Sequence, residues 1–216
     1  MSRSGRDEAA VVRAAASTLG LAMDAATLDR ILRFSATLAT WNRRLRLTGD
    51  QDPVRIAEQH IADSLAVVGV LPATGPVIDI GSGQGFPGII LGCVRPELEI
   101  VLVESRRRRA SFLRDAVRQI PLPHATVREE RAESIGAPLA GNARLVVARA
   151  IRLDVLLALA RPLLAPEGRV IAMQSEQGRR EAPRIATDAG FRLVDERRYS
   201  LPDGSVRVLV AFSAEV

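Results

Sequence analysis

A short segment before the middle of the chain constrains the fold more than any other. Residues 77–88 read VIDIGSGQGFPG: an apolar run ends near an acid, and four glycines follow within eight residues. The apolar segment GIILGCV continues directly from the last of them. A β-branched run, a glycine-rich turn and a helix in this order are typical of the first unit of a cofactor-binding α/β fold. The segment therefore predicts a turn whose backbone a ligand can approach closely.

After this loop, strand-like and helix-like segments alternate. Short β-branched runs occupy residues 77–80, 99–104, 125–129, 144–149 and 168–174. The segments between them predict helices at about 86–94, 105–119, 151–163 and 177–189. This alternation predicts right-handed crossovers and a parallel sheet covered by helices on both faces.

The last two predicted strands break the alternation. Residues 191–201 and 205–213 are joined only by Pro202-Asp203-Gly204, and so short a turn predicts an antiparallel hairpin. Five parallel strands followed by a hairpin are typical of Rossmann-like, class I methyltransferases. We therefore expect a mostly parallel seven-stranded sheet with a C-terminal antiparallel hairpin.

The first third of the chain predicts a helical extension. Apolar residues recur at helical spacing in segments 8–19, 24–45 and 53–68, with no long strand-like alternation. The turn-rich segment LPATGP at 71–76 marks a boundary. We expect an extension at 1–73 and a cofactor-binding domain at 74–216, packed as one body because 216 residues suffice for one good core.

Two ligand-binding patterns overlap in the glycine loop. Residues 83–88 match the GxGxxG pattern of dinucleotide-binding folds, whereas residues 81–85 match the GxGxG of methyltransferases. A carboxylate at Asp79 repels a pyrophosphate but suits the ammonium and sulfonium groups of S-adenosylmethionine. Pro87 removes a backbone N–H from the helix end that would bind a phosphate. The residues favour S-adenosylmethionine, with an NAD(P)-dependent oxidoreductase as the alternative.

Polar residues follow the second predicted strand. Glu104 stands at its carboxyl end, where an acid can accept hydrogen bonds from ribose hydroxyls. Capping of the helix that starts at Ser105 is the alternative. The run 106–109 consists of four arginines, which form either a solvated helix face or a site for a polyanion.

Composition excludes several kinds of chemistry. All thirty basic residues are arginine, so Schiff-base lysines and Walker-type lysines are excluded. The formal net charge of +5 permits a nucleic-acid partner, because arginine grips phosphate with two parallel hydrogen bonds. Cys93 is the single cysteine, and with two histidines we expect no metal site. No apolar window is long enough for a membrane span and no secretory signal is recognisable, so we expect a cytoplasmic protein that does not contact membranes.

The residues at the end of the fourth predicted strand limit which atom of a base can accept the methyl group. They read Val147-Ala-Arg149-Ala-Ile151. Methyltransferases that act on an exocyclic amine usually have an acidic or amide residue here, followed by two prolines and an aromatic residue, and this chain lacks that motif. A cytosine C5 enzyme needs a cysteine nucleophile, and Cys93 lies far from this edge. A purine N7 already offers a lone pair and needs no base, so alignment and desolvation suffice.

Three segments resemble one known family. They are WNRRLRLTGDQDPVRIAEQHIADSLAV (41–67), the stretch 77–114 with its Gly-x-Gly-x-Gly-Phe-Pro-Gly loop, and VVARAI (146–151). In this order they resemble the bacterial small-subunit ribosomal RNA methyltransferase G family, also called glucose-inhibited division protein B, over about residues 25–175. The resemblance implies methylation of N7 of a guanine in 16S ribosomal RNA by S-adenosylmethionine. It implies as partner the small ribosomal subunit or an assembly intermediate.

The resemblance also implies roles for individual residues. Gly81 and Phe86 would contact the cofactor, Ala132 and Glu133 would flank its adenine, and Arg149 would face its methionine end or the target base. His60 and Asp63 match a segment packed near the cofactor. The chain departs from the family at Arg46, often Asn there, and at Gln174, where the family has lysine.

The sequence thus proposes two sets of site residues. The cofactor set, in which Arg149 is also the catalytic candidate, is Asp79, Gly81, Gly83, Gly85, Phe86, Glu104, Ala132, Glu133 and Arg149. The RNA set is Arg43, Arg46, His60, Arg106, Arg108 and Arg109.

Structural alternatives stay open for several of these residues. His60 with Asp63 can equally be a pair that ties the helices to the sheet, Trp41 is expected in the core, and Arg43 with Arg46 can be a plain polar face. An RNA-binding or assembly protein with a vestigial cofactor fold is the non-enzyme alternative.

Overall fold

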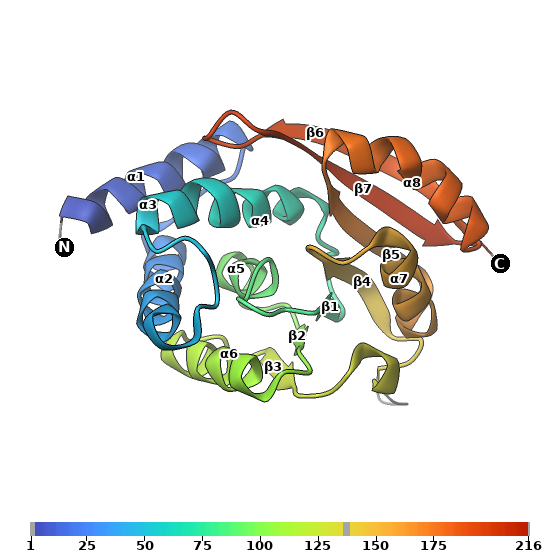
Figure 1. The fold of residues 1–216 in the computed structure, drawn as a ribbon, viewed down its shortest axis with the longest axis horizontal. Helices are drawn as coiled ribbons and strands as arrows, with labels where there is room; N and C mark the ends of the chain where they lie inside the picture. Colours follow the sequence, from blue (N-terminus) through green and yellow to red (C-terminus); the bar gives the residue numbers. More distant parts are fainter. Residues whose placement is uncertain (1–2, 136–138, 216) are drawn as a thin grey trace.

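The computed structural model describes residues 3–135 and 139–215, which fold as helices packed around one sheet (Figure 1). The α-helices are α1 (Arg3–Thr18), α2 (Ala25–Leu45), α3 (Pro53–Ile56), α4 (Ala62–Ala66), α5 (Gly88–Val94), α6 (Arg107–Gln119), α7 (Leu153–Ala160) and α8 (Glu176–Asp188). Shorter turns are the π-helical η1 (Ala57–Ile61) and the 3-10 turns η2 (Val67–Val70), η3 (Ala132–Ser134) and η4 (Arg161–Leu163). The strands are β1 (Val77–Ile80), β2 (Ile100–Val103), β3 (Ala125–Arg128), β4 (Ala143–Ala148), β5 (Leu164–Gln174), β6 (Phe191–Ser200) and β7 (Val206–Ala214).

The sheet has the predicted topology. Within the described residues its seven strands follow the order β3-β2-β1-β4-β5-β7-β6, in which β1 to β5 are parallel. Strand β7 runs antiparallel between β5 and β6, which confirms the C-terminal hairpin. The strand order reverses at β1, between β2 and β4. The carboxyl ends of these strands form the crevice where α/β sheets bind ligands.

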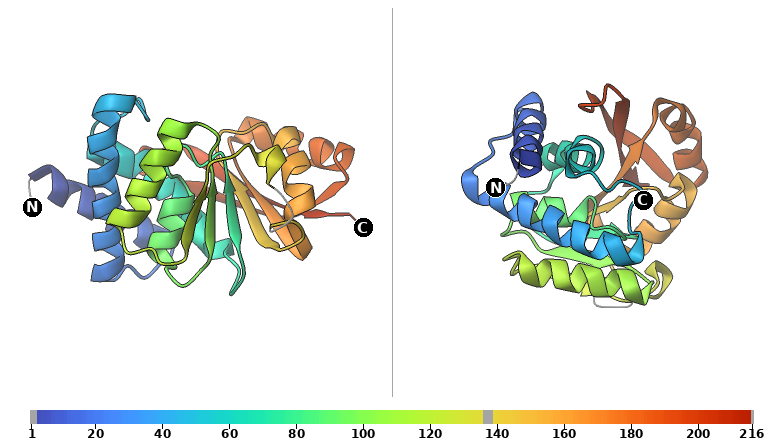
Figure 2. Two further views of the ribbon diagram at one scale, coloured as in Figure 1. Left: turned by 90° about the horizontal axis from the view of Figure 1, so that it is seen from below. Right: turned by 60° about the vertical axis from the view of Figure 1, so that its left-hand side comes forward.

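Helices cover both faces of the sheet. Because successive side chains of a strand point to opposite faces, Val77 packs in one core and Ile78 in the other. Helices α5 and α6 cover the face of Val77, together with the N-terminal helices, and α7 and α8 cover the face of Ile78 (Figure 1). The views in Figure 2 show the same two layers with α2 lying along α6.

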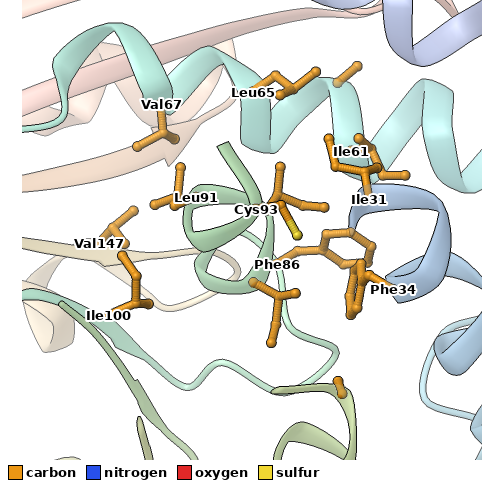
Figure 3. Close-up of a cluster of buried hydrophobic side chains, with 14 of the residues drawn as sticks. Ile31, Phe34, Ile61, Leu65, Val67, Phe86, Leu91, Cys93, Ile100 and Val147 are labelled. Carbon is orange, nitrogen blue, oxygen red and sulfur yellow. The ribbon is translucent and has the colours of Figure 1, made fainter. Parts of the chain in front are cut away.

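The N-terminal helices share a core with α5. Figure 3 shows Ile31 and Phe34 of α2 and Ile61 of η1 near the loop residue Phe86, with Leu65 of α4 in the same cluster on the other side of Cys93. The ring centroids of Phe34 and Phe86 lie 5.3 Å apart in an edge-to-face arrangement. The glycine loop is therefore held by the N-terminal helices as well as by the sheet that it follows. The boundary between residues 73 and 74 stays a prediction.

Some elements differ locally from the predicted bounds. The helix expected at 53–68 contains the π-helical turn η1, which shifts the side-chain register at His60. Such turns are common at functional sites. Helix α5 begins at Gly88 rather than 86, because Phe86 and the cis Phe86-Pro87 bond belong to the loop. No helix in the described part of the chain is long and apolar enough to cross a membrane.

Candidate functional site

The glycine loop uses most of its own backbone N–H groups. Those of Gly81 and Ser82 donate to the Val103 carbonyl, and that of Gly85 donates to the Ser82 carbonyl. The N–H of Gly83 donates to Oε2 of Glu104 at 3.1 Å. A diphosphate needs such groups free at the start of the helix. The loop therefore offers few free donors to a diphosphate.

Asp79 occupies the helix end itself. Its Oδ2 accepts the N–H of Gly88, the first residue of α5, at 3.0 Å, and the residue is fully buried. Burial raises the pKa of Asp79 to about 7. Its other oxygen, Oδ1, is buried without a hydrogen-bond partner among the described residues. Asp79 thus fills the place where a phosphate would bind and keeps one acceptor unused.

The predicted cofactor glycines face different surroundings. Gly81, Gly83 and Gly85 have φ values of +71°, +48° and +87°, a conformation that favours glycine. A Cβ on Gly81 would lie 3.1 Å from Ile151, just past β4. A Cβ on Gly85 would lie 2.9 Å from the Phe34 ring. Gly85 therefore gives α2 its close approach, and any contact of its backbone with a cofactor stays a prediction.

Glu104 follows β2, as predicted, and is almost fully buried. Its Oε1 accepts the backbone N–H of Arg106 at 2.7 Å while its Oε2 holds Gly83. It therefore joins the glycine loop to the start of α6. Each carboxylate oxygen can accept more than one hydrogen bond, so ribose hydroxyls remain possible partners.

Arg149, Phe86 and His60 meet above the carboxyl end of β4. The guanidinium carbon of Arg149 lies 5.2 Å from the centroid of the Phe86 ring. Nη1 of Arg149 lies 3.0 Å from Nδ1 of His60 and 3.5 Å from Oδ2 of Asp63. Arg149 thus links the end of β4 to the π-helical turn through His60 and to α4 through Asp63.

Charge and burial fix the protonation of this cluster. Burial and then the Arg149 guanidinium lower the pKa of His60 to about 4, although Asp50 acts in the opposite direction. His60 is therefore neutral near pH 7, and its Nδ1 accepts from Arg149. Burial raises the pKa of Asp63, against the effects of Tyr199 and Arg149. The Tyr199 hydroxyl donates to Oδ1 of Asp63 at 2.5 Å.

Three features of the cluster were not predicted from the sequence. The side-chain amide of Gln84 donates to the Leu47 carbonyl at 2.5 Å, and its Oε1 lies 3.5 Å from Nη2 of Arg149. Ala150 has a φ of +62°, which non-glycine residues rarely adopt outside functional sites. Tyr199 reaches the cluster from β6, far along the sequence. A long polar side chain inside the glycine loop was the one signal that pointed to Gln84.

A hollow of about 220 Å³ opens beside Arg149. Its lining residues are Gln59, His60, Asp63, Arg149, Met173, Gln174, Ser175 and Arg207. It lies at the carboxyl ends of β4 and β5. Its lining includes His60 and Gln174, the residue at which the chain departs from the lysine of the family. Polar and charged side chains dominate its walls, so it suits a polar planar group.

The predicted arginines lie around the loop with different exposures. Arg43 and Arg46 are exposed at the end of α2, where Arg46 has a φ of +47°. Arg106 and Arg108 are exposed before and within the first turn of α6. Arg109 is half-buried, with Nη1 beside Gly83. Within the described residues none of the five forms an ion pair, so all can meet an external anion.

Ala132 and Glu133 lie in η3, the turn after β3. Ala132 is half-buried against the core of the Ile78 face, whereas Glu133 is exposed. Their predicted contact with adenine stays a prediction. Nowhere in residues 3–135 and 139–215 do three or more histidine, cysteine or acidic side chains gather as metal ligands would.

Two solved methyltransferases have a fold similar to that of this chain. A ribosomal protein L11 methylase of Lactobacillus delbrueckii superposes with a TM-score of 0.59 at 13% identity, over 78% of this chain and 81% of that chain. A tRNA methyltransferase of Bacillus subtilis superposes with a TM-score of 0.57 at 16% identity, over 70% and 65% of the two chains. At such low identity these similarities establish the fold alone.

Proteins found by sequence comparison are more similar to this chain than these solved structures. A sequence model of the family described as rRNA small subunit methyltransferase G matches residues 27–200. The protein called ribosomal RNA small subunit methyltransferase G in Geobacter sp. M21 is 35% identical over 205 residues, 93% of this chain and 94% of that protein. Its counterpart in Xanthomonas campestris is 36% identical over 181 residues, 83% of each chain. The chain therefore belongs to the ribosomal RNA small subunit methyltransferase G family, whose members are S-adenosylmethionine-dependent methyltransferases of ribosomal RNA.

Proposed function

We propose that this protein methylates N7 of a guanine in 16S ribosomal RNA, within the small subunit or an assembly intermediate, in the cytoplasm. The observation that carries the proposal is the placement of Arg149. Its guanidinium is held by His60, Asp63 and Phe86 at the sheet edge beside the glycine loop. His60 is a weak base there, because its pKa is about 4 and Arg149 occupies its Nδ1. A guanine N7 needs no base, since its lone pair is free.

The residues at the loop fit S-adenosylmethionine. Asp79, with a pKa of about 7 and an unpartnered buried Oδ1, becomes charged when a cationic ligand lies nearby, and Glu104 offers acceptors for hydroxyls. Gly81 has a left-handed backbone, and a Cβ there would crowd the Ile151 side chain at 3.1 Å. When bound, S-adenosylmethionine supplies the methyl group on a sulfonium that leaves as a neutral thioether. Asp79, Gly81, Gly83, Phe86 and Glu104 bind and orient it.

Arg149 acts on the target base. A guanidinium in this position can donate to O6 of guanine and leave N7 accessible, with Phe86 beneath it to exclude water. The hollow next to Arg149 receives the base. Rate acceleration then comes from alignment and desolvation rather than from proton transfer. Ala132 and Glu133 flank the adenine of the cofactor in this proposal.

The unpaired arginines around the loop bind the RNA backbone. Arg43 and Arg46 lie at the end of α2, and Arg106, Arg108 and Arg109 lie at the start of α6. Each phosphate contact releases counterions, so affinity for RNA falls steeply as salt rises. The long side chains at both positions can adapt to a folded RNA surface.

The proposal is tested by incubating purified 30S subunits, and naked 16S RNA, with S-adenosylmethionine labelled in the methyl group. We expect label in one guanine, released as 7-methylguanine after mild depurination. Label in another base, or in another position of guanine, contradicts the proposal. Tight RNA binding without transfer would support a non-catalytic assembly protein, and saturable NADH binding would support an oxidoreductase.

A further inference from the structure

Two surface hollows lie between α2 and α6, outside the proposed methyl-transfer site. The two helices run side by side in Figure 2. One hollow, of about 360 Å³, is lined by Trp41, Ser111, Arg114, Asp115 and Arg118. The other, of about 330 Å³, is lined by Thr40, Trp41, Arg44, Leu45 and Asp115. Trp41 and Asp115 line both hollows and separate them, and we call this pair the Trp41–Asp115 ridge.

The Trp41 side chain is held by two contacts and stays partly exposed. Its Nε1–H donates to Oδ2 of Asp115 at 2.8 Å, and its ring meets Phe112 edge-on at a centroid distance of 6.1 Å. The side chain is half-buried, not part of the closed core as the sequence suggested. An indole fixed by its polar edge, with hollows on either side, is a preformed surface for stacking a planar group.

The charges around the ridge favour an anionic ligand. Arg44, Arg114 and Arg118 line the hollows, against Asp115 as the acid in their walls. The side chains of Arg114 and Arg118 are 48% and 77% exposed, and they form ion pairs with Glu129 at 2.7 Å and with Asp115 at 2.6 Å. Three arginines thus stand against two acids around the ridge. Arg44 is exposed and forms no ion pair with any residue the structure describes. An aromatic face flanked by arginines is the combination that binds single-stranded nucleic acid.

The ridge is connected to the cofactor loop by packed aromatic rings. Phe112 lies between Trp41 and Phe34, with a centroid distance of 6.3 Å to Phe34. Phe34 in turn packs against Phe86 of the loop at 5.3 Å (Figure 3). A ligand on the ridge is therefore held at a fixed position relative to the methyl-transfer site.

We propose that the Trp41–Asp115 ridge is a second contact site for single-stranded ribosomal RNA. One unpaired base stacks on Trp41 in the hollow of Arg44 and Leu45. Neighbouring phosphates pair with Arg114 and Arg118 in the other hollow, in exchange for the exposed ion pairs of these arginines with Glu129 and Asp115. The inference rests on the proposed function, because it assumes a ribosomal RNA substrate, and it adds a site remote from the reacting base.

The test uses Trp41 as its own reporter, since it is the only tryptophan. The probe is a ten-nucleotide oligo(A), titrated at low salt into the intact protein. We expect quenching of the fluorescence, with affinity lowered several-fold in Arg44→Ala. Arg180→Ala is the matched control, because Arg180 is also an exposed helical arginine without an ion pair in the described chain. It should bind like the wild type.

Variants at Trp41 complete the test with purified 30S subunits. Trp41→Ala should lower affinity roughly tenfold, the usual loss for one stacked base. Trp41→Phe retains a ring against Phe112 and should lose less. Affinity for S-adenosylmethionine should be unchanged in all variants, which separates a local loss from misfolding.

Two outcomes overturn the proposal. The first is unchanged fluorescence at saturating oligo(A), with wild-type affinity of Trp41→Phe and Arg44→Ala for 30S subunits. The second is weaker binding of these variants to 30S subunits but not to free 16S RNA or oligo(A), because the ridge would then contact a ribosomal protein. If no RNA is methylated but oligo(A) still quenches Trp41 and Arg44→Ala weakens it, the proposed function fails and the ridge stands.

Discussion

Nη1 of Arg149 lies 3.0 Å from Nδ1 of His60, and this contact joins the end of β4 to the π-helical turn. A neutral imidazole accepts the hydrogen bond, which is consistent with the pKa of about 4 for His60. The contact fixes the guanidinium over Phe86. The position of the proposed catalytic arginine therefore depends on a helix that precedes the sheet in the sequence.

Replacing Arg149 tests its role directly. Arg149→Ala should lower kcat/KM for 30S subunits at least 100-fold, because a positioned donor to the target base contributes about 3 kcal/mol. The free energy of unfolding should fall by only about 1–2 kcal/mol, since Tyr199 still satisfies Asp63. Chemical denaturation and initial rates measure the two effects. Arg152→Ala, whose side chain is 80% exposed, is the control. Normal turnover with a large loss of stability would make Arg149 a structural residue.

His60 makes stability depend on pH in a defined window. Its folded pKa of about 4 is below the value of 6.5 for a free histidine, so the unfolded chain binds more protons between these values. The wild type should therefore lose stability as pH falls from 6.5 to 4, relative to His60→Asn, by up to about 3 kcal/mol. Urea denaturation across this range measures the difference. Parallel stability curves for the two proteins would contradict the assigned environment.

Gly81 and Gly141 form a matched pair for the cofactor loop. Both have a φ of +71°, but a Cβ on Gly81 would meet Ile151 whereas none of the described atoms lies within 4 Å of one on Gly141. Substitution by alanine should cost each protein about 1–2 kcal/mol of backbone strain. Only Gly81→Ala should also weaken binding of S-adenosylmethionine, by tenfold or more in calorimetric titration. Equal donor affinity in the two variants would remove Gly81 from the cofactor site.

Asp79 should titrate in the opposite sense to His60. Its pKa rises on folding from 3.8 to about 7, so its charge destabilises the fold progressively as pH increases between these values. Asp79→Asn keeps an acceptor for Gly88 and should become more stable than the wild type as pH rises, by at most about 4 kcal/mol. Its affinity for S-adenosylmethionine should fall. An unchanged affinity at pH 8 would show that the carboxylate serves the fold alone.

The fold was largely predictable because its signals are local. Four-residue apolar strands such as 77–80 and 100–103, with helical segments between them, predict parallel order by chain connectivity. The three-residue turn 202–204 likewise predicts the hairpin. The π-helical turn η1 was not predicted, since the phase shift that one added residue causes cannot be recognised between helical segments of only four and five residues.

Candidate site residues could be proposed from the sequence only where a motif carries them. Motifs singled out Arg149 and the glycine loop, whose roles stay predictions, whereas the contact of Gln84 with Leu47 joins residues far apart in the sequence. The contact of Gly85 with a cofactor stays a prediction, whereas the packing of Phe34 against Gly85 was not predicted, because packing of α2 is a long-range property. The contact of Asp79 with a ligand stays a prediction, and the buried side chain of Asp79 reaches from β1 to the first residue of α5. It thus disfavours a dinucleotide by occupying the helix end as well as by its charge.

The central claim is methylation of one guanine N7 in 16S ribosomal RNA. Mass mapping of 16S RNA from cells with and without this protein tests it most directly, with a strain carrying Arg149→Ala as a third sample. We expect one guanine to lose the mass of a methyl group in the absence of the protein and in the variant. Identical maps in all three samples, or a methyl lost from a base other than guanine, would contradict the account.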